Sequence, residues 1–404
     1  MTLLEFHRDP LSMLLQYGEL DQPVTPIRLG RWTLYLVTGE QETSYVLSHH
    51  VRHFKKGPGM DQRNPLIGNG LLLSETPRWE VARRLVKDEF VPSTVQTKAP
   101  LMRSAISQQL DTWPAGICNV AERLVDLTAA VVMTSLFEVQ PDPAELRQII
   151  INSQQLMLYF YRRSRSFFRP PYHMPWPANR TYWKAAVPLG QMADKLYSLR
   201  SGGRSEFLNR LEQLPSDERR AQIVTFLIAG HETTANALSW TLGLLAHHPV
   251  VQHKARSNAL WREAAIKESL RLYPPVWLLS RSTVASIQLG DYLLPPGNSI
   301  LVSPWVSHRL TRNFQRANEF LPERWFTDEK VSPSVYFPFG GGQRSCIGES
   351  FAMQEILLAI EQILFRFELA PATDLMAQPL PLLSLRPMNG MWIAVAPNVS
   401  GDFH

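Results

Sequence analysis

The 404 residues predict a mainly α-helical protein with small β-sheets, folded as a single domain over residues 1–404. Apolar residues make up 45% of the chain and charged residues 19%, which is the balance of a folded globular protein. From Arg78 to about Glu212, apolar residues recur at the spacing of an amphipathic helix. No internal repeat and no clear linker divides the sequence, so one domain is expected.

The N-terminal part, at about residues 20–60, is expected to be rich in β-structure. Residues 26–32 and 33–39 predict two short strands that turn at Gly30, and residues 40–47 predict a short helix.

Helices are expected through the middle of the chain. Residues 101–110 and 121–137 have apolar side chains at helical spacing. An aromatic stretch over residues 159–183 is rich in proline and is expected to be irregular.

A long helix is expected to start at Ser216, a suitable cap that acidic residues follow. It should continue through the apolar segment 223–246 and end at His248, because a proline comes next. A second helix is expected over residues 258–272, where prolines again stop it.

The C-terminal part begins with a predicted β-hairpin over residues 286–302, with the Pro-Pro-Gly run at 295–297 as its turn. A loop rich in proline and glycine then leads to Cys346. Residues 349–369 predict the last helix.

The composition argues against several classes of protein. The net charge is +5, but no run of lysine and arginine interleaved with aromatic residues points to nucleic acid. The first residues carry charges and no apolar segment, so they do not resemble a signal peptide. No apolar run is long enough to span a bilayer, and we expect a cytosolic protein without a transmembrane anchor.

The chain has two cysteines, Cys118 and Cys346. This number does not make a disulfide framework, and a zinc site would have to recruit scattered histidines. No motif surrounds Cys118, which we interpret as an ordinary buried or surface thiol.

Cys346 lies in a glycine-rich loop before the last predicted helix, with the pattern F-x-x-G-x-R-x-C-x-G over residues 339–348. The helix N-terminus stabilises negative charge, so the thiol is expected to be a thiolate, the form that binds metals. The glycines allow the backbone to wrap closely around a large, flat group. A glycine-rich turn with an inert thiol is the alternative, but this pattern is rare by chance.

A second motif, Ala-Gly-His-Glu-Thr-Thr over residues 229–234, lies inside the long apolar helix. Glycine within a helix lowers its stability, and threonine can bond to the carbonyl four residues earlier, so a local groove can open. A buried acid and alcohol, Glu232 and Thr233, are costly unless they have a function. Taken alone, such a pair is more often a satisfied structural network.

With these motifs the sequence resembles the cytochrome P-450 superfamily over essentially the whole chain. The resemblance implies a triangular prism of helices, with haem between the long oxygen-groove helix and the helix after the cysteine loop. It also implies that the cofactor is haem b and that Cys346 is the axial ligand of its iron. A thiolate ligand donates electron density to the iron and favours O–O cleavage.

The same resemblance assigns roles to three neighbours of Cys346. Phe339 would shield the sulfur, Arg344 would pair with a haem propionate, and Gly348 would permit the turn into the last helix.

In the long helix, the resemblance implies that Ala229 borders the haem at the groove that holds dioxygen. Thr233 would steady the reduced oxygen species, and Glu232 would supply protons. His231 occupies a variable position and is given no catalytic role.

Trp79 and Arg83 lie one helical turn apart, where an indole N–H and a cation suit a haem propionate. Without the resemblance, a core tryptophan beside a solvated arginine is an equal alternative. Arg281 is similar to the family's other propionate-binding arginine.

Glu268 and Arg271, three residues apart, would alone be an ordinary surface ion pair. In the family they join the arginine of a Pro-Glu-Arg-Trp run, here Arg324, in a network that braces the haem loop. This role is structural and not catalytic.

The implied function is a haem-thiolate monooxygenase that inserts one atom of O2 into a hydrophobic small molecule. A terpenoid, carotenoid, fatty acid or other product of secondary metabolism would serve as substrate. Electrons would come from NAD(P)H through a reductase and a ferredoxin, for which Arg84 and Lys87 are candidate contacts, and a monomer is expected. A peroxide-driven peroxygenase and a non-catalytic haem sensor or carrier are the alternatives.

Three arginines, Arg162, Arg163 and Arg165, lie among aromatic residues where the family closes a lid over its pocket. They suit an amphipathic substrate that ends in a carboxylate. A membrane-facing lid that admits a wholly apolar molecule, and a solvated basic loop over core aromatics, are the other interpretations.

Overall fold

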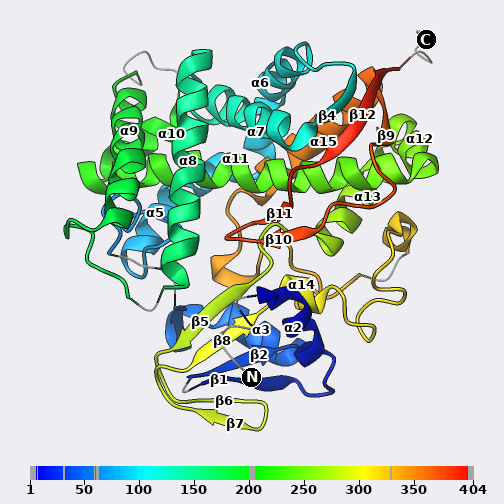
Figure 1. Ribbon diagram of the computed structural model, residues 1–404. Coiled ribbons are helices and arrows are strands. Elements are labelled where there is room, and N and C mark those ends of the chain that lie inside the picture. The colour runs from blue at the N-terminus through cyan, green and yellow to red at the C-terminus, as the bar shows by residue number, and fades with distance from the viewer. Residues whose placement is uncertain are drawn as a thin grey trace. The chain divides into compact units, whose positions relative to one another are not determined.

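A computed structural model describes residues 6, 8–30, 32–58, 60, 63–166, 168–199, 205–327 and 330–398 (Figure 1). The chain forms two compact units, each built from two separate segments. The first combines the chain up to Met60 with Lys267–Cys346, and the second combines residues 61–266 with the chain from Ile347 onward. The single domain predicted over residues 1–404 stays a prediction.

A five-stranded sheet organises the first unit, in the order β1-β2-β8-β5-β3. Strands β2 and β8 pair in parallel, and the other neighbours pair antiparallel. The strands are β1 (Val24–Leu29), β2 (Trp32–Val37), β3 (Phe54–Lys56), β5 (Leu279–Thr283) and β8 (Ser299–Val302). The two strands predicted near the N-terminus are therefore confirmed, with boundaries a little earlier than expected, and Gly30 between them has a φ of +61°.

Short helices come before and after these strands along the chain. The hydrophobic core of this unit includes Ile300 of β8 together with Val46 and Phe337, which lie outside the sheet. The helical elements are α2 (Pro10–Gly18), α3 (Glu40–Ser48), α4 (His50–His53), α14 (Pro304–Ser307), η5 (Pro322–Phe326) and η6 (Gly342–Arg344). The short helix expected over residues 40–47 is α3.

The turn of the hairpin predicted over residues 286–302 was placed wrongly. Strands β6 (Ile287–Leu289) and β7 (Tyr292–Leu294) form the hairpin, and Gly290 at its turn has a φ of +54°. A glycine at the first turn position is what a type II′ hairpin needs. The Pro-Pro-Gly run instead connects β7 to β8, because β8 pairs with β2 and β5 in the larger sheet.

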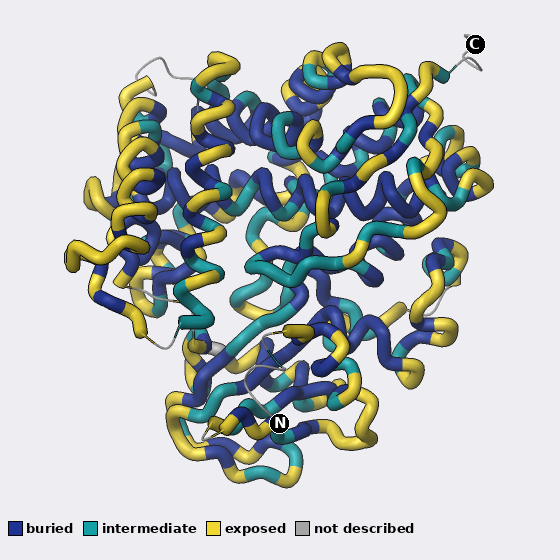
Figure 2. The backbone as a smooth tube through the Cα atoms, in the orientation of Figure 1, coloured by how far each residue is buried: buried dark blue, intermediate teal, exposed yellow. Residues whose placement is uncertain are grey.

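The second unit is mostly helical, as predicted, and α11 (Ser216–His247) is its longest helix (Figure 1). Nearly every α11 residue from Ala221 to Ala246 is buried, which is why the helix is dark blue for most of its length in Figure 2. A helix that is apolar all round is stable in water only inside a protein. The other helical elements are α5 (Arg78–Val86), η1 (Lys87–Phe90), α6 (Pro92–Leu110), α7 (Val120–Val131), the π-helical η2 (Val132–Leu136), α8 (Pro143–Ser164), α9 (Pro177–Leu199), α10 (Glu206–Arg210), η4 (Leu211–Gln213), α12 (Pro249–Ser257) and α15 (Glu349–Arg366). The helix α13 (Ala259–Leu272) belongs to this unit up to Ile266 and to the first unit from Lys267 onward.

The starts of α11 and α13 show two kinds of cap. The helix α11 begins at Ser216, but Pro215 occupies the cap position and no side chain caps the backbone, so the predicted serine cap was wrong. Asn258 does cap α13, because its Oδ1 accepts the Leu260 N–H at 2.8 Å. The helix α12 fills the stretch between them, for which the sequence pattern predicts no element.

Two small sheets complete the second unit: β4 (Gly116–Asn119), β12 (Trp392–Pro397) and β9 (Phe367–Pro371) in one, and β10 (Pro379–Pro381) with β11 (Leu385–Pro387) in the other. The last helix was predicted to reach residue 369, but it ends at Arg366. The residues after it pair with β12, where Leu369 lies opposite Val395. A strand partner distant in sequence therefore overrides local helical spacing.

The irregular stretch is shorter than the predicted 159–183. The helix α8 continues to Ser164, and α9 begins at Pro177, because proline is tolerated in the first turn of a helix. No helix among the described residues has both the length and the apolar content that crossing a bilayer requires.

Candidate functional site

The cysteine loop belongs to the first unit, and Cys346 is exposed there. Its backbone N–H donates to the Phe339 carbonyl at 2.8 Å, which closes the loop. Gly342 has a φ of +64°, and a Cβ at this position would lie 2.1 Å from the Leu47 carbonyl oxygen. Glycine is thus required both by the left-handed backbone and by the close approach of α3.

Within the loop, Phe339 and Arg344 are half-buried, and the helix α15 begins three residues after Cys346. Gly348 caps that helix with a φ of −87°, which any residue adopts. The role of Gly348 in the turn into the last helix stays a prediction.

The donor set around Cys346 suits a metal that arrives inside a prosthetic group. The described residues contain no group of three histidine, cysteine or acidic side chains that could hold a bare metal ion. A single exposed thiol before a helix N-terminus can act as one axial ligand, with the remaining coordination supplied by the group itself. This set fits a haem.

The motif in α11 has the hydrogen bonds that its sequence suggests. The Thr233 hydroxyl donates to the Ala229 carbonyl at 2.9 Å, and the Thr234 hydroxyl donates to the Gly230 carbonyl at 3.1 Å. Ala229, Gly230 and Thr233 are half-buried, whereas the other residues of α11 from Ala221 to Ala246 are buried. This helix therefore has one open face lined by small side chains.

Gly230 has a packing role that the sequence did not indicate. A Cβ at Gly230 would lie 3.0 Å from Cγ2 of Val132, the first residue of the π-helical turn η2. Helical turns of this kind are rare and often accompany functional sites. The Ser205 hydroxyl donates to the Leu136 carbonyl at 3.1 Å and so satisfies an acceptor at the end of this turn.

Glu232 is 4% exposed and makes contacts with the β10–β11 hairpin. Its Oε1 accepts from the Ser384 hydroxyl and lies 2.8 Å from Nη2 of Arg386. Asn236, one turn later in α11, donates to the same Ser384 hydroxyl at 3.1 Å. Ser384 and Arg386 were not identified from the sequence, because no motif surrounds them and they lie about 150 residues from Glu232.

His231 faces the interior, and its ring Nδ1 contacts the Leu227 carbonyl. Burial lowers the pKa of this histidine, so it is neutral. The Thr128 hydroxyl donates to its backbone carbonyl at 2.9 Å. That His231 has no catalytic role stays a prediction.

Besides Arg344, three residues are proposed as propionate contacts: Trp79, Arg83 and Arg281. Trp79 and Arg83 lie on α5 in the second unit, and the Arg83 guanidinium carbon is 5.6 Å from the centre of the Trp79 ring. Arg281 is a buried residue of β5 in the first unit, where it donates to the Ser280 carbonyl at 3.0 Å.

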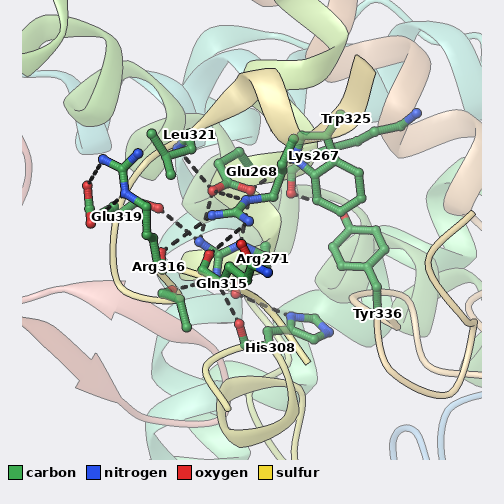
Figure 3. A network of polar contacts seen from close by, with 12 residues as sticks. Lys267, Glu268, Arg271, His308, Gln315, Arg316, Glu319, Leu321, Trp325 and Tyr336 are labelled. Atoms are coloured by element: carbon green, nitrogen blue, oxygen red, sulfur yellow. Dashed lines mark hydrogen bonds and ion pairs between the residues drawn. The ribbon is translucent and has the colours of Figure 1, made fainter. Parts of the chain in front are cut away.

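In the first unit, the Glu-Arg-Arg ion pairs are present (Figure 3). Glu268 lies 2.8 Å from Arg271, both fully buried, and 2.9 Å from Nε of Arg324. The Trp325 indole and the Leu321 backbone also donate to Glu268, at 2.9 and 3.0 Å. Such a buried pair is favourable only when its remaining donors and acceptors are satisfied.

His308 extends this network and was not identified from the sequence. Its Nε2 accepts the Phe337 N–H at 3.0 Å, so Nδ1 carries the proton and donates to the Arg271 carbonyl at 3.2 Å. Burial, with Arg271 nearby, lowers the pKa of His308 to about 3. Phe337 precedes Phe339 by two residues, so a neutral histidine links the ion pairs to the cysteine loop.

Other predicted groups have simpler surroundings. Cys118 is buried in β4, and burial raises the pKa of its thiol, which agrees with an ordinary thiol. Arg163 donates to the Pro170 carbonyl at 2.9 Å and lies over the Tyr172 ring, whereas Arg162 is exposed. Arg165 bonds to the Tyr161 hydroxyl.

The sequence and the fold of this chain are similar to those of known proteins. A model of the cytochrome P450 family matches residues 1–260 and 261–393. Cyclooctatin synthase from Streptomyces melanosporofaciens is 30% identical, over 94% of this chain and 89% of its own length. Pentalenene oxygenase from Streptomyces avermitilis is 25% identical, over 93% of this chain and 89% of its own length.

Among solved structures, a cytochrome P450 from Thermus thermophilus aligns with a TM-score of 0.85 and 27% identity, covering 98% of this chain and 99% of that chain. A six-coordinated cytochrome P450 from another strain of the same species gives a TM-score of 0.81 at 26% identity, with the same coverage. Because the family model matches nearly the whole sequence and the fold agrees over its full length, the chain belongs to the cytochrome P450 family of haem-thiolate monooxygenases.

Proposed function

We propose that this monooxygenase inserts one oxygen atom into a hydrophobic natural product of the terpenoid, carotenoid or fatty-acid class. NAD(P)H supplies the electrons through a reductase and a ferredoxin. The observation that carries the proposal is the exposed Cys346, held by its bond to the Phe339 carbonyl before α15, with no cluster of other metal ligands among the described residues.

The haem, when bound through Cys346, supplies the site at which dioxygen is bound and cleaved, and the thiolate ligand favours that cleavage. The protein's own residues bind and orient this group. Arg83, Arg281 and Arg344 provide cations for the propionates, and the Trp79 N–H adds a neutral donor. Phe339 shields the sulfur.

On α11, Ala229 leaves space on the open face of the helix. The Thr233 hydroxyl donates its one proton to the Ala229 carbonyl at 2.9 Å. Rotation away from this carbonyl would let it donate a hydrogen bond on the open face. Glu232 holds and releases protons for the reduction of dioxygen. The Glu268–Arg271–Arg324 network fixes the chain that leads into the cysteine loop.

The substrate class is supported by the relatives and by the lid region. Pentalenene oxygenase is one of the most similar proteins of known name. Of the three lid arginines, Arg163 is engaged with Pro170 and Tyr172, which leaves Arg162 as the exposed cation. This weakens the case for a carboxylate rim and favours an apolar substrate. The monomeric state and the cellular location stay predictions.

The test begins with the cofactor. Purified protein should contain haem b, and its reduced CO complex should show the red-shifted Soret band of thiolate ligation. Cys346→Ala should remove this band, whereas the matched variant Cys118→Ala should keep it. Loss of the band in Cys118→Ala alone would contradict the assignment of the ligand.

Turnover then separates the proposed function from its alternatives. With a surrogate ferredoxin, its reductase and NAD(P)H, a panel of terpenoids, carotenoids and fatty acids should include a substrate that shifts the haem spin state and gains one oxygen atom. Product formed with peroxide but not with ferredoxin would indicate a peroxygenase. Ligand binding without any product would indicate a sensor or carrier.

A further inference from the structure

Two histidines lie one helical turn apart where α3 meets α4 in the first unit. His49 follows the last residue of α3 and is exposed, and His53 is the last residue of α4 and is half-buried. The His53 N–H donates to the His49 carbonyl at 3.2 Å, so the backbone between them makes a helical turn. Their rings are nearly parallel, at 11°, with the ring centres 6.0 Å apart. The two imidazoles therefore lie on one face of this turn.

Tyr45, one turn earlier, contacts both rings at Nδ1. Its backbone carbonyl lies 3.2 Å from Nδ1 of His49, and its hydroxyl lies 2.7 Å from Nδ1 of His53. A carbonyl only accepts, so Nδ1 of His49 carries the proton, and Nε2 of the neutral ring keeps its lone pair. The hydroxyl oxygen can accept from His53 in the same way. Among the described residues, neither Nε2 has a hydrogen-bond partner.

The tyrosine is itself held in place. Its ring packs edge-on against the buried Phe54, with 5.8 Å between the ring centres. Burial raises the pKa of the Tyr45 hydroxyl, so the side chain stays a neutral phenol. Side chains bind metals in their deprotonated form, so this hydroxyl is suited to orient His53 and not to bind an ion itself.

The pair has two features of metal-binding histidines. Two imidazoles four residues apart on a helix can bind one ion together. Each ligating ring commonly donates its other N–H to a carbonyl or a similar acceptor, which fixes the tautomer and the orientation. A zinc–nitrogen bond is about 2.0–2.1 Å long, so two bound Nε2 atoms lie within about 4 Å of each other. The two rings reach this separation by tilting about their side-chain bonds.

We propose that His49 and His53 form a binding site for a divalent transition metal, Cu²⁺ or Zn²⁺, in which Tyr45 positions both rings. Two protein ligands fall short of the three or four that hold a permanent ion, so water fills the remaining positions and the ion exchanges with solution. Imidazole favours these ions, whereas Mg²⁺ and Ca²⁺ favour oxygen ligands.

The site lies beside the cysteine loop. The carbonyl oxygen of Leu47, two residues before His49, would be only 2.1 Å from a Cβ at Gly342, so the end of α3 packs tightly on η6. An ion bound by both histidines links the cap of α3 to the end of α4 next to this contact. Because the ion needs the folded turn to bind both rings, it stabilises the native protein.

Zinc titrations of the haem-loaded protein, prepared without a histidine tag and followed by calorimetry, test the site. His49→Ala and His53→Ala each remove one ligand and leave a single imidazole. His253→Ala is the matched control, because this exposed histidine of α12 has no histidine one turn before or after it. Tyr45→Phe keeps the aromatic ring and removes the hydroxyl that contacts His53. The spectrum of the reduced CO complex checks that each variant is folded.

We expect the wild type and His253→Ala to bind one Zn²⁺ with equal affinity, also in excess Mg²⁺. Both ligand variants should lose this binding, because one imidazole then acts alone. Tyr45→Phe should weaken it about 10-fold or more. No saturable binding by the wild type, or unchanged binding after replacement of both histidines, would overturn the proposal. Equal affinity in Tyr45→Phe would overturn the positioning role of the hydroxyl.

Two further measurements do not depend on the titration. Zn²⁺ should raise the midpoint of thermal unfolding of the wild type and leave that of His49→Ala unchanged. In a crystal of the haem-loaded protein soaked in Zn²⁺, an anomalous peak between the two Nε2 atoms supports the site. A metal peak at other histidines only, or an equal thermal shift in His49→Ala, overturns it.

Discussion

Arg271 shows at the residue scale how a buried charge is made compatible with the core of the first unit. The side chain is fully buried, yet its five N–H groups all have acceptors. Two bonds go to Glu268, and three go to the backbone carbonyls of His308, Ala317 and Glu319. A lysine has three donors and no planar fork, so it cannot replace this arrangement.

The pKa of His308 makes stability depend on pH. An unfolded histidine has a pKa of about 6.5, whereas burial lowers the pKa of His308 in the folded protein to about 3. Between these values the unfolded chain binds a proton that the native protein does not. The free energy of unfolding should therefore fall as the pH drops from about 6.5 toward about 3, by up to ~1.4 kcal/mol per pH unit from this group.

His308→Gln should make this pH dependence shallower, since glutamine does not titrate. Unfolding by denaturant between pH 5 and pH 7 would measure the slopes. At neutral pH the variant should lose about 1–3 kcal/mol, because the Phe337 N–H or the Arg271 carbonyl loses its partner. Identical slopes in both proteins would show that His308 does not titrate on unfolding.

Thr233→Ala should uncouple electron consumption from oxygenation. Without the hydroxyl, NAD(P)H oxidation should continue while product falls and hydrogen peroxide accumulates. Thr234→Ala is the matched control, because it removes an equivalent hydroxyl bonded to the carbonyl four residues earlier, at a buried position. Equal peroxide release from the two variants would argue against a specific role for Thr233.

At the element scale, α11 is shaped as much by its neighbours as by its own residues. Its central turn packs against η2, which follows α7, through Gly230 and Val132. Three α11 side chains at four-residue intervals form hydrogen bonds with the β10–β11 hairpin: Glu232, Asn236 and Trp240. A mid-helix glycine costs about 1 kcal/mol relative to alanine, and the approach of Val132 explains why that cost is accepted.

The effect of Gly230→Ala on stability should therefore have opposite signs in the wild-type protein and in Val132→Ala protein. Alone, the new Cβ crowds Val132, and overpacking of about 1–3 kcal/mol should outweigh the gain in helix propensity. In Val132→Ala protein, the same change should stabilise by up to about 1 kcal/mol. Denaturant unfolding of the wild type, the two single variants and the double variant gives the coupling energy between the two positions. If the two effects were additive, Val132 would not be the reason that Gly230→Ala destabilises the protein.

At the scale of the whole molecule, the net charge of +5 favours an acidic partner. Arg84 at the end of α5 and Lys87 at the start of η1 are both exposed. Replacing both with glutamate should raise the apparent KM for an acidic ferredoxin about 10-fold at low salt and leave substrate binding unchanged.

Lys184→Glu on α9 provides a control for this experiment, because it makes a charge reversal at another exposed position. Steady-state rates over a range of ferredoxin and salt concentrations decide the matter. A KM for ferredoxin that does not depend on salt would show that Arg84 and Lys87 have no role in docking. An equal rise of this KM in Lys184→Glu would show the same.

The sequence by itself determined the cysteine loop, the Glu-Thr pair of the long helix and the ion-pairing residues Glu268 and Arg271. Each of these signals is local. The residues of each signal lie within a few positions of one another, as in helical spacing, a glycine run or an i,i+3 pair. Local backbone geometry alone therefore sets how their side chains lie relative to one another.

Only the tertiary structure decided which groups hold those residues in place. Ser384 and Arg386 reach Glu232 across about 150 residues, and His308 connects Arg271 with Phe337. Long-range strand pairing also ended the last helix at Arg366. No local pattern encodes such contacts, because they depend on which distant surfaces the chain buries together, and burial is a property of the folded molecule.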